Sequence, residues 1–168
     1  MTGILTDNLY PSGSIVQVKQ AFTATTDTYT SSNTWFNLGG LQVDITPKLS
    51  NSQMLISGQL GCVDHDQNSY LVIFRYARYQ GNITKVIGVG ANVGRVGTTA
   101  IRGTASADVN GIIGSVLPQF IDSPGASAQI SYFVQANNYN GGSFYYNRDK
   151  GNNENFPSSL TVMEIAPW

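Results

Sequence analysis

Charged residues are scarce in this 168-residue chain, where Asp, Glu, Lys and Arg make up 11% of the sequence. An ordinary soluble domain carries about 25%. The formal net charge is −1, so there is no excess of basic residues to attract nucleic acid or an anionic membrane. We therefore expect neither as a partner. Neutral polar residues must solvate the surface instead.

Cysteine and histidine occur once each, at Cys62 and His65. A lone cysteine cannot form an intrachain disulfide, so stability must come from packing, to which oligomerisation can add. The two residues are too close in sequence for the imidazole to serve easily as the base of a nucleophilic thiol. No further metal ligands recur elsewhere with suitable spacing. We expect Cys62 to continue a core face and Asp64–Asn68 to be a solvated loop.

Motifs for cofactors and catalysis are incomplete. Asp64–Asn68 resembles the start of a calcium loop, but Ser69 replaces the required Gly and Arg75 the required Glu. Paired carboxylates and an oxyanion-forming motif are also missing. We predict that the chain is not an enzyme and that it has no catalytic residues, no cofactor and no metal site.

Long apolar runs are missing too. No stretch approaches the roughly 20 residues that span a bilayer, and residues 1–13 lack the features of a secretory signal. No ten residues show a helical apolar stripe. Instead, about nine short strands alternate with Gly, Pro and Asn turns. This pattern predicts an all-β fold, an antiparallel two-sheet β-sandwich over residues 14–168, preceded by an arm at residues 1–13.

The longest apolar stretch is Ser69–Tyr79. Both of its alternating faces are mostly large and apolar, which is typical of a central strand covered on both sides. We assign one face to the core (Tyr70, Val72, Phe74, Tyr76). The other face (Leu71, Ile73, Arg75, Ala77, Tyr79) is expected to meet a second surface, where Arg75 has a partner for its charge.

Other strands show a single apolar side. Leu41–Thr46 and Gln53–Cys62 alternate clearly, with Gly58 a candidate bulge. Ser14–Phe22 is expected to be half-buried, with Val16, Val18 and Phe22 on its apolar side. Pro118 indicates an edge strand or a bulge, and Gly81-Asn82 fits a tight hairpin turn.

Two groups are candidates for binding. Exposed apolar residues on a terminal arm are unexpected unless they dock on something. The arm carries Ile4, Leu5, Leu9 and Tyr10, and fully extended it would reach roughly 40 Å. It either reaches a partner or folds back on its own domain. Aromatic rings beside amides suit sugar recognition, and the second group is Tyr139, Asn140, Tyr145, Asn152 and Asn153. The alternative is that these aromatics are core residues and the Asn residues form turns.

Several stretches resemble a domain found at the C-terminal end of tail-fibre-like virion proteins from phages of cyanobacteria and marine bacteria. The similar stretches, in order, are Gly13–Gln20, Leu41–Pro47, Phe120–Pro124, Tyr146–Arg148 and Ser158–Ala166. The resemblance implies a jelly-roll-like sandwich that forms a homotrimer on the virion surface after assembly in the host cytoplasm. The second face of Ser69–Tyr79, with Leu71, Ile73 and Arg75, would then lie at the subunit interface.

Only thirteen residues precede the predicted sandwich domain, without a stalk or repeat. This setting favours a capsid decoration (cement) protein whose arm docks on phage capsid protein. The alternative is the receptor-binding head of a short tail fibre, which would attach to a tail component and recognise host surface glycan.

Overall fold

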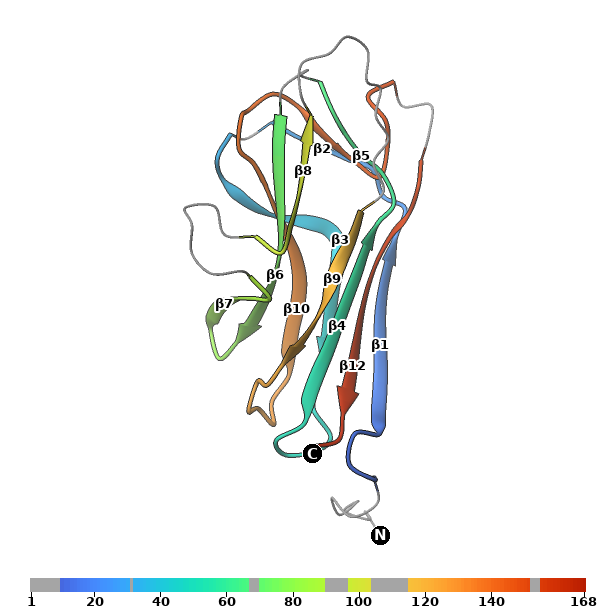
Figure 1. The fold of residues 1–168 in the computed structure, drawn as a ribbon, viewed down its shortest axis with the longest axis vertical. Coiled ribbons are helices and arrows are strands. Elements are labelled where there is room, and N and C mark those ends of the chain that lie inside the picture. The colour runs from blue at the N-terminus through green and yellow to red at the C-terminus, as the bar shows by residue number, and fades with distance from the viewer. Residues whose placement is uncertain (1–9, 31, 67–69, 90–96, 104–114, 152–154) are drawn as a thin grey trace.

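The protein is an elongated, jelly-roll-like β-sandwich (Figure 1). The computed structural model describes residues 10–30, 32–66, 70–89, 97–103, 115–151 and 155–168. Within these residues there are twelve strands and no helix, and every strand pair is antiparallel. The predicted fold class is therefore confirmed.

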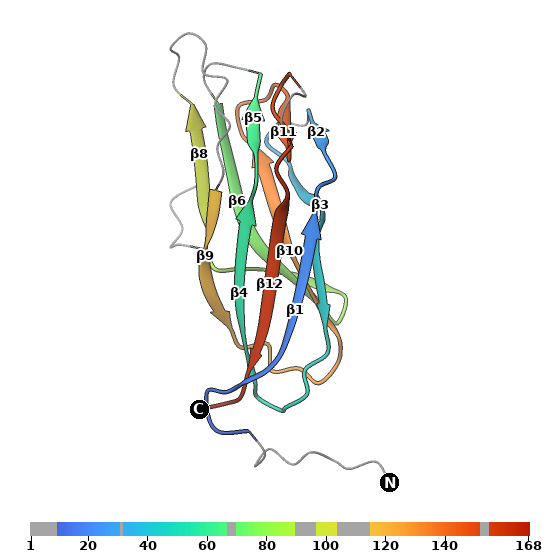
Figure 2. The same ribbon diagram turned by 90° about the vertical axis from the view of Figure 1, so that its right-hand side faces the viewer.

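One face of the sandwich is a four-stranded sheet with the order β1-β12-β4-β9 (Figure 2). Its strands are β1 (Ile15–Thr23), β12 (Ser158–Ile165), β4 (Gln53–Leu60) and β9 (Ser115–Asp122). A small sheet of β2 (Asp27–Tyr29), β11 (Phe144–Tyr146) and β5 (Val63–His65) has the matching order β2-β11-β5. Its strands continue β1, β12 and β4 toward the end of the sandwich that we call the head.

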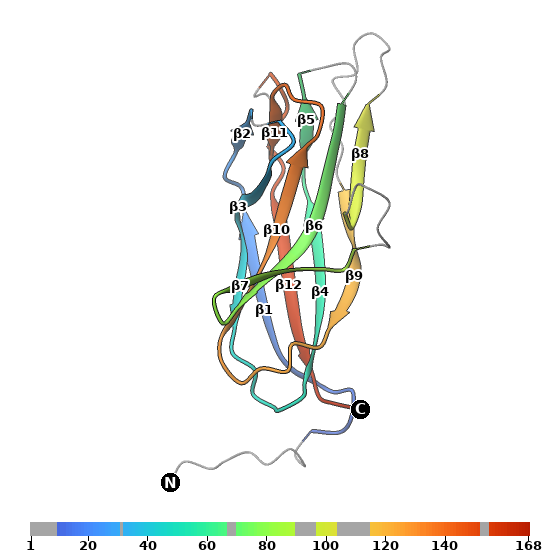
Figure 3. The same ribbon diagram turned by 90° about the vertical axis from the view of Figure 1, so that its left-hand side faces the viewer.

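The opposite face is the sheet β3-β10-β6-β7, with β8 also paired to β6 (Figure 3). These strands are β3 (Trp35–Ile45), β10 (Ile130–Asn138), β6 (Tyr70–Gln80), β7 (Ile83–Ile87) and β8 (Thr99–Gly103). The turn from β6 to β7 contains Gly81 and Asn82, both with positive φ, as the predicted tight hairpin requires. β6 lies inside its sheet, as its apolar sequence predicted.

A single apolar core fills the space between the sheets. Residues at alternating positions of each strand supply it. The predicted inward set of β6 and the apolar sides of the two alternating stretches that form β3 and β4 are all buried: Tyr70, Val72, Phe74, Tyr76, Leu41, Val43, Ile45, Met54, Ile56 and Leu60. Cys62 continues the same burial. The register irregularity between β4 and β9 falls where Gly58 and Pro118 were expected to disturb the strands.

The second side of β6 is covered only in part, and by the same chain: Leu71 and Arg75 are half-buried and Tyr79 is 43% exposed. Ile73 is 5% exposed and Ala77 is fully buried. Gly97 lies so close to the Ile73 side chain that a Cβ atom would not fit there, and the Thr98 N–H donates to the carbonyl oxygen of Phe74 at 2.7 Å. Burial of both sides therefore does not by itself require a neighbouring subunit.

The expectation for the first strand is wrong in one respect. β1 forms, but Val18 and Phe22 are 51% and 68% exposed, and the Ala21 side packs against the core. β1 is one of the two edge strands of its sheet, with a register shift between Ile15 and Gln17. Alternation shows which residues share a side, but it does not show which side the core occupies.

Candidate interaction surfaces

Most acidic side chains of the described residues accept hydrogen bonds from backbone N–H groups. Glu164 is buried and accepts hydrogen bonds from the N–H groups of Lys48 and Leu49, at 2.8 and 3.0 Å. Asp64 accepts from the N–H groups of His65 and Lys150, both at 2.7 Å. No three His, Cys, Asp or Glu side chains of the described residues lie together in a way that could hold a metal ion. In the same residues, no helix is long and apolar enough to cross a membrane.

His65 and Asp64 are not in a solvated loop, contrary to expectation. They form part of β5 and are 5% and 3% exposed. The His65 ring stacks on Tyr70 at 4.8 Å, and its Nε2 lies 3.0 Å from Asn138 Oδ1. Because the Asn138 amide nitrogen donates to Gly142, its oxygen is the acceptor and Nε2 donates. The sequence pattern did not predict this strand, because consecutive polar residues such as those of β5 are also typical of a loop.

The structure describes only three of the five residues predicted to contact a glycan. Tyr145 and Tyr139 are half-buried and Asn140 is exposed, all near the head. Asn152 and Asn153 lie outside the described residues. The Arg148 guanidinium lies 4.7 Å from the centre of the Tyr145 ring and donates to Thr28 Oγ1 at 2.6 Å. A polar hollow of about 450 Å³ adjoins them, lined by Thr26, Asp27, Thr28 and Arg148.

The hollow offers a carboxylate, a guanidinium and hydroxyl groups, which suit a ligand rich in hydroxyls. Sequence reasoning named Tyr145 but missed Arg148 and the β2 residues. Arg148 is only three residues from Tyr145, but the β2 residues are more than a hundred residues away in the chain, so only the fold brings them to this hollow.

The predicted interface group lies on the outer side of β6. Leu71 and Ile73 line an apolar hollow of about 340 Å³ together with Gly97, Thr99 and Ala100. Arg75 has partners within the chain: its guanidinium lies 3.6 Å from the centre of the Trp35 ring, and its Nε donates to Gln135 Oε1 at 2.8 Å. Burial lowers the pKa of Arg75.

Of the predicted docking group, Ile4, Leu5 and Leu9 lie outside the described residues, and Tyr10 is half-buried. The chain after Tyr10 runs beside the C-terminal residues at the end of the sandwich opposite the head, which we call the foot (Figure 1). There the Gly13 N–H donates to the carbonyl oxygen of Ala166 at 3.2 Å. The Trp168 ring packs directly over Gly13.

A buried ion pair connects the two sheets and was missed by sequence reasoning. Arg78 of β6 donates to Asp122 Oδ2 of β9 at 2.5 Å, and the Tyr132 hydroxyl donates to the same oxygen at 2.8 Å. Burial, followed by the nearby Asp122 carboxylate, raises the pKa of Tyr132. Arg78 shares the inward side of β6 with Tyr76, so its position in the alternation could have revealed it.

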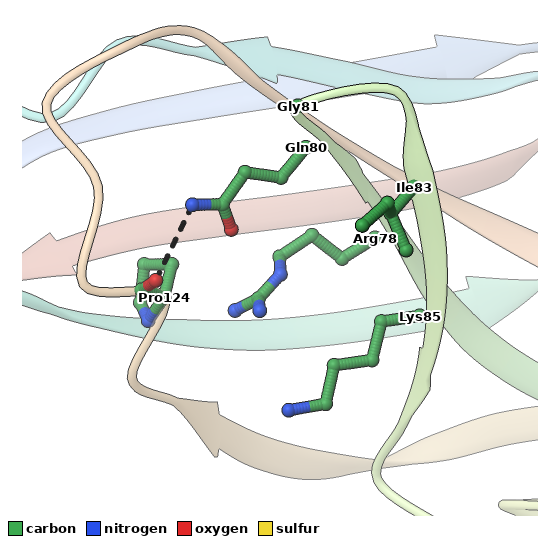
Figure 4. A pocket seen from close by; sticks show the side chains of 6 residues that line it. All are labelled: Arg78, Gln80, Gly81, Ile83, Lys85 and Pro124. Atoms are coloured by element: carbon green, nitrogen blue, oxygen red, sulfur yellow. Dashed lines mark hydrogen bonds between the residues drawn. The ribbon is translucent and has the colours of Figure 1, made fainter.

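A hollow of about 380 Å³ adjoins this ion pair (Figure 4). Arg78, Gln80 and Lys85 extend toward it, and the Gln80 side-chain amide donates to the carbonyl oxygen of Pro124 at 3.4 Å.

No protein-family model matches the chain, and no curated protein matches it in sequence. Among solved structures, it is similar to an infectious bursal disease virus protein (Gt strain) at 11% identity and a TM-score of 0.44. That match covers 89% of this chain and 38% of the viral chain.

The PRD1 vertex protein P5 is similar at 11% identity and a TM-score of 0.39, over 91% of this chain and 99% of that one. The CBM22-1 xylan-binding domain of Paenibacillus barcinonensis Xyn10C is similar at 11% identity and a TM-score of 0.36, over 95% and 99%. Similarity at this low identity and TM-score is found with both viral and carbohydrate-binding proteins, so it does not distinguish between functions.

Proposed function

We propose that the chain is a non-enzymatic structural protein of a phage virion surface, a homotrimer that decorates and stabilises the capsid through its N-terminal arm. One observation carries the proposal. The elongated sandwich has two ends, the foot and the head (Figures 1 and 2). They differ chemically, because the foot exposes the apolar Trp168 and Ile15 whereas the head has a polar hollow lined by Thr28 and Arg148.

The foot is suited to attachment. Trp168 and Ile15 are 81% and 57% exposed there, close to where the described chain begins at Tyr10. Exposed apolar groups gathered in one place are typical of a surface that is covered in an assembly. The sequence just before Tyr10 contains three further apolar residues, Ile4, Leu5 and Leu9.

The head is suited to facing water. Thr28 of β2 and Arg148, which follows β11, line a polar hollow, and Tyr145 of β11 lies under the Arg148 guanidinium. A decoration protein that attached by its foot would therefore show its polar end to the medium. Three arms on one trimer would hold the capsid together with higher avidity than any one arm.

The proposal is tested by binding to capsids that lack the protein. Replacing the apolar arm residues (Ile4→Asn, Leu5→Asn, Leu9→Asn) should reduce cosedimentation at least tenfold, because each loses its buried apolar contact. The matched control replaces polar residues of the same arm (Thr2→Ala, Thr6→Ala, Asn8→Ala) and should bind like the wild type. Full binding by the Asn variant would refute the arm as the attachment.

The second candidate is the receptor-binding head of a short tail fibre, which the polar hollow beside Tyr145 and Arg148 favours. Copy number separates the two functions. Hundreds of copies per particle support decoration, whereas a number tied to the symmetry of the tail supports the fibre. Binding of a host glycan that is lost in Arg148→Ala would also support the fibre.

A further inference from the structure

The outer side of the sheet β1-β12-β4-β9 carries an apolar row that crosses all four strands. Val18 of β1 pairs with Met163 of β12, Met163 pairs with Leu55 of β4, and Leu55 pairs with Ile121 of β9. Paired residues of an antiparallel sheet project on the same side. The four side chains therefore form a continuous band, which we call the apolar row.

The row is accessible in the single subunit. Val18 and Ile121, at its two ends, are 51% and 47% exposed. Eight large apolar residues are exposed in the described part of the chain, and four of them (Ile15, Val18, Phe22 and Ile121) lie on this one sheet. A fifth, Trp168, is tied to its lower edge by a 2.6 Å hydrogen bond from Nε1 to Gln53 Oε1.

The same face has no charge. Among the four strands the ionisable residues are Lys19, Glu164 and Asp122. All three alternate onto the inner side: Lys19 pairs with the buried Val162, while Glu164 and Asp122 are themselves buried. Beyond the row, the outer positions are neutral polar groups such as Gln20, which donates to Thr161 Oγ1 at 3.0 Å.

From these observations we infer that the outer face of β1-β12-β4-β9 is the surface by which copies of this chain associate. The inference rests on the homotrimer of the proposed function and assigns its interface. Identical copies carry identical charges, so a face without charge is one that they can bury together without like-charge repulsion. Amide and hydroxyl groups both donate and accept, so the neutral polar positions can pair with the same groups of another copy.

The size of the face fits a whole subunit better than a peptide. Four strands at about 4.8 Å spacing and about eight residues at 3.3 Å cover roughly 500 Å² in outline. This outline is of the same order as the roughly 800 Å² of accessible area that each partner buries in a stable interface. The N-terminal segment of residues 1–9 could cover only one strip of this face.

The test is the mass of the full-length protein in solution, measured by sedimentation between about 1 and 100 µM against the 18.1 kDa of one chain. The wild type should form an oligomer. Val18→Glu combined with Ile121→Glu should weaken association at least 100-fold, because carboxylates at both ends of the row would be desolvated together. The control Ile83→Glu, at a 68% exposed position of β7, should leave the mass unchanged.

Each other result overturns the inference. An oligomer that survives the double variant but dissociates in Leu71→Glu would place the interface on the outer side of β6 and leave the proposed homotrimer intact. A wild type that is monomeric at 100 µM would exclude this face as a self-association surface. Association that appears only after deletion of residues 2–9 would show that the chain's own arm covers the row. Binding to capsids is measured separately, so failure here is distinguishable from failure of the arm hypothesis.

Discussion

At the scale of single residues, Asn147 joins the two halves of the molecule. It lies where β1, β4 and β12 give way to the small head sheet, and it is fully buried. Its side-chain amide donates to the carbonyl oxygens of Thr23 and Thr25, at 3.1 and 3.0 Å. Its Oδ1 accepts from the Ser158 hydroxyl at 2.5 Å, and its N–H donates to Cys62. One side chain thus satisfies the backbone where the strands are interrupted.

Asn147→Ala should lower the free energy of unfolding by about 3 kcal/mol, since it leaves buried carbonyl groups and a hydroxyl without partners. Asn147 also has φ 57°, which Asn tolerates better than Ala. Asn51→Ala is the matched control, because Asn51 has φ 60° but is exposed. It should cost about 1 kcal/mol in urea unfolding. Equal losses in the two variants would mean that the buried hydrogen bonds contribute nothing.

The lowered pKa of Asp66 leads us to expect that the stability of the fold depends on pH. Burial alone would raise the pKa of Asp66, but the hydrogen bond from the Ser143 N–H, at 2.8 Å, and the nearby His65 and Lys150 together lower it. A depressed folded-state pKa gives stability that is present above the unfolded value of about 3.9 and is lost as pH falls through the folded value.

Asp66→Asn should therefore be less stable than the wild type at pH 7, and the difference should shrink as pH falls from about 5 to 2. Urea midpoints across this range measure it. A deficit that stayed constant down to pH 2 would show that the charge of Asp66 is not the cause.

At the scale of elements, the pair Arg78–Asp122 links β6 to β9 across the core. Breaking one partner of a buried pair costs about 3–5 kcal/mol, because the other charge is left uncompensated. Asp122→Asn and Arg78→Met should each show such a loss in chemical denaturation. The double variant should lose clearly less than the sum, since no charge remains buried and Asn still accepts from Tyr132. Strict additivity would exclude a direct interaction.

The strands illustrate what a sequence can predict. β6 was identified because both of its alternating sides are apolar, and its inward set is buried as expected. β1 was assigned the wrong covered side, because an edge strand with a bulge satisfies the same alternation either way. The apolar side of such a strand is equally compatible with a core and with a partner. Which of the two applies depends on the neighbouring strands, and these are far away in the sequence.

The candidate surfaces were predictable to a similar extent. Tyr145 was recognised from its aromatic and amide surroundings, but the hydrogen bond from Arg148, which lies over the Tyr145 ring, to the hydroxyl of Thr28 needs the pairing of β11 with β2. The apolar row needs the register of three strand pairs. Each of its members alone is an ordinary apolar residue of an amphipathic strand.

At the scale of the whole molecule, the core is shared by all three sheets. The same apolar cluster contains Val63, Phe144 and Tyr146 of the small head sheet and Ile56 and Val162 of the long sheet. A common core couples the head to the rest of the sandwich, so the two should unfold together rather than in stages. Cys62 lies at the junction between β4 and β5 and is fully buried.

Cys62 is the only thiol, so its reactivity reports on this coupling without interference. Labelling by a thiol reagent should be at least about 1,000-fold slower in the native protein than in the unfolded chain, as expected for a site exposed only by global unfolding. Urea should accelerate labelling with the same dependence as the equilibrium unfolding measured by circular dichroism, because both then expose the same surface. Fast labelling that is insensitive to urea would instead show that the head opens independently while the long sheets remain folded. The hydrogen bonds of Asn147 would then be too weak to couple the head to the long sheets, and Asn147→Ala would leave the labelling rate unchanged.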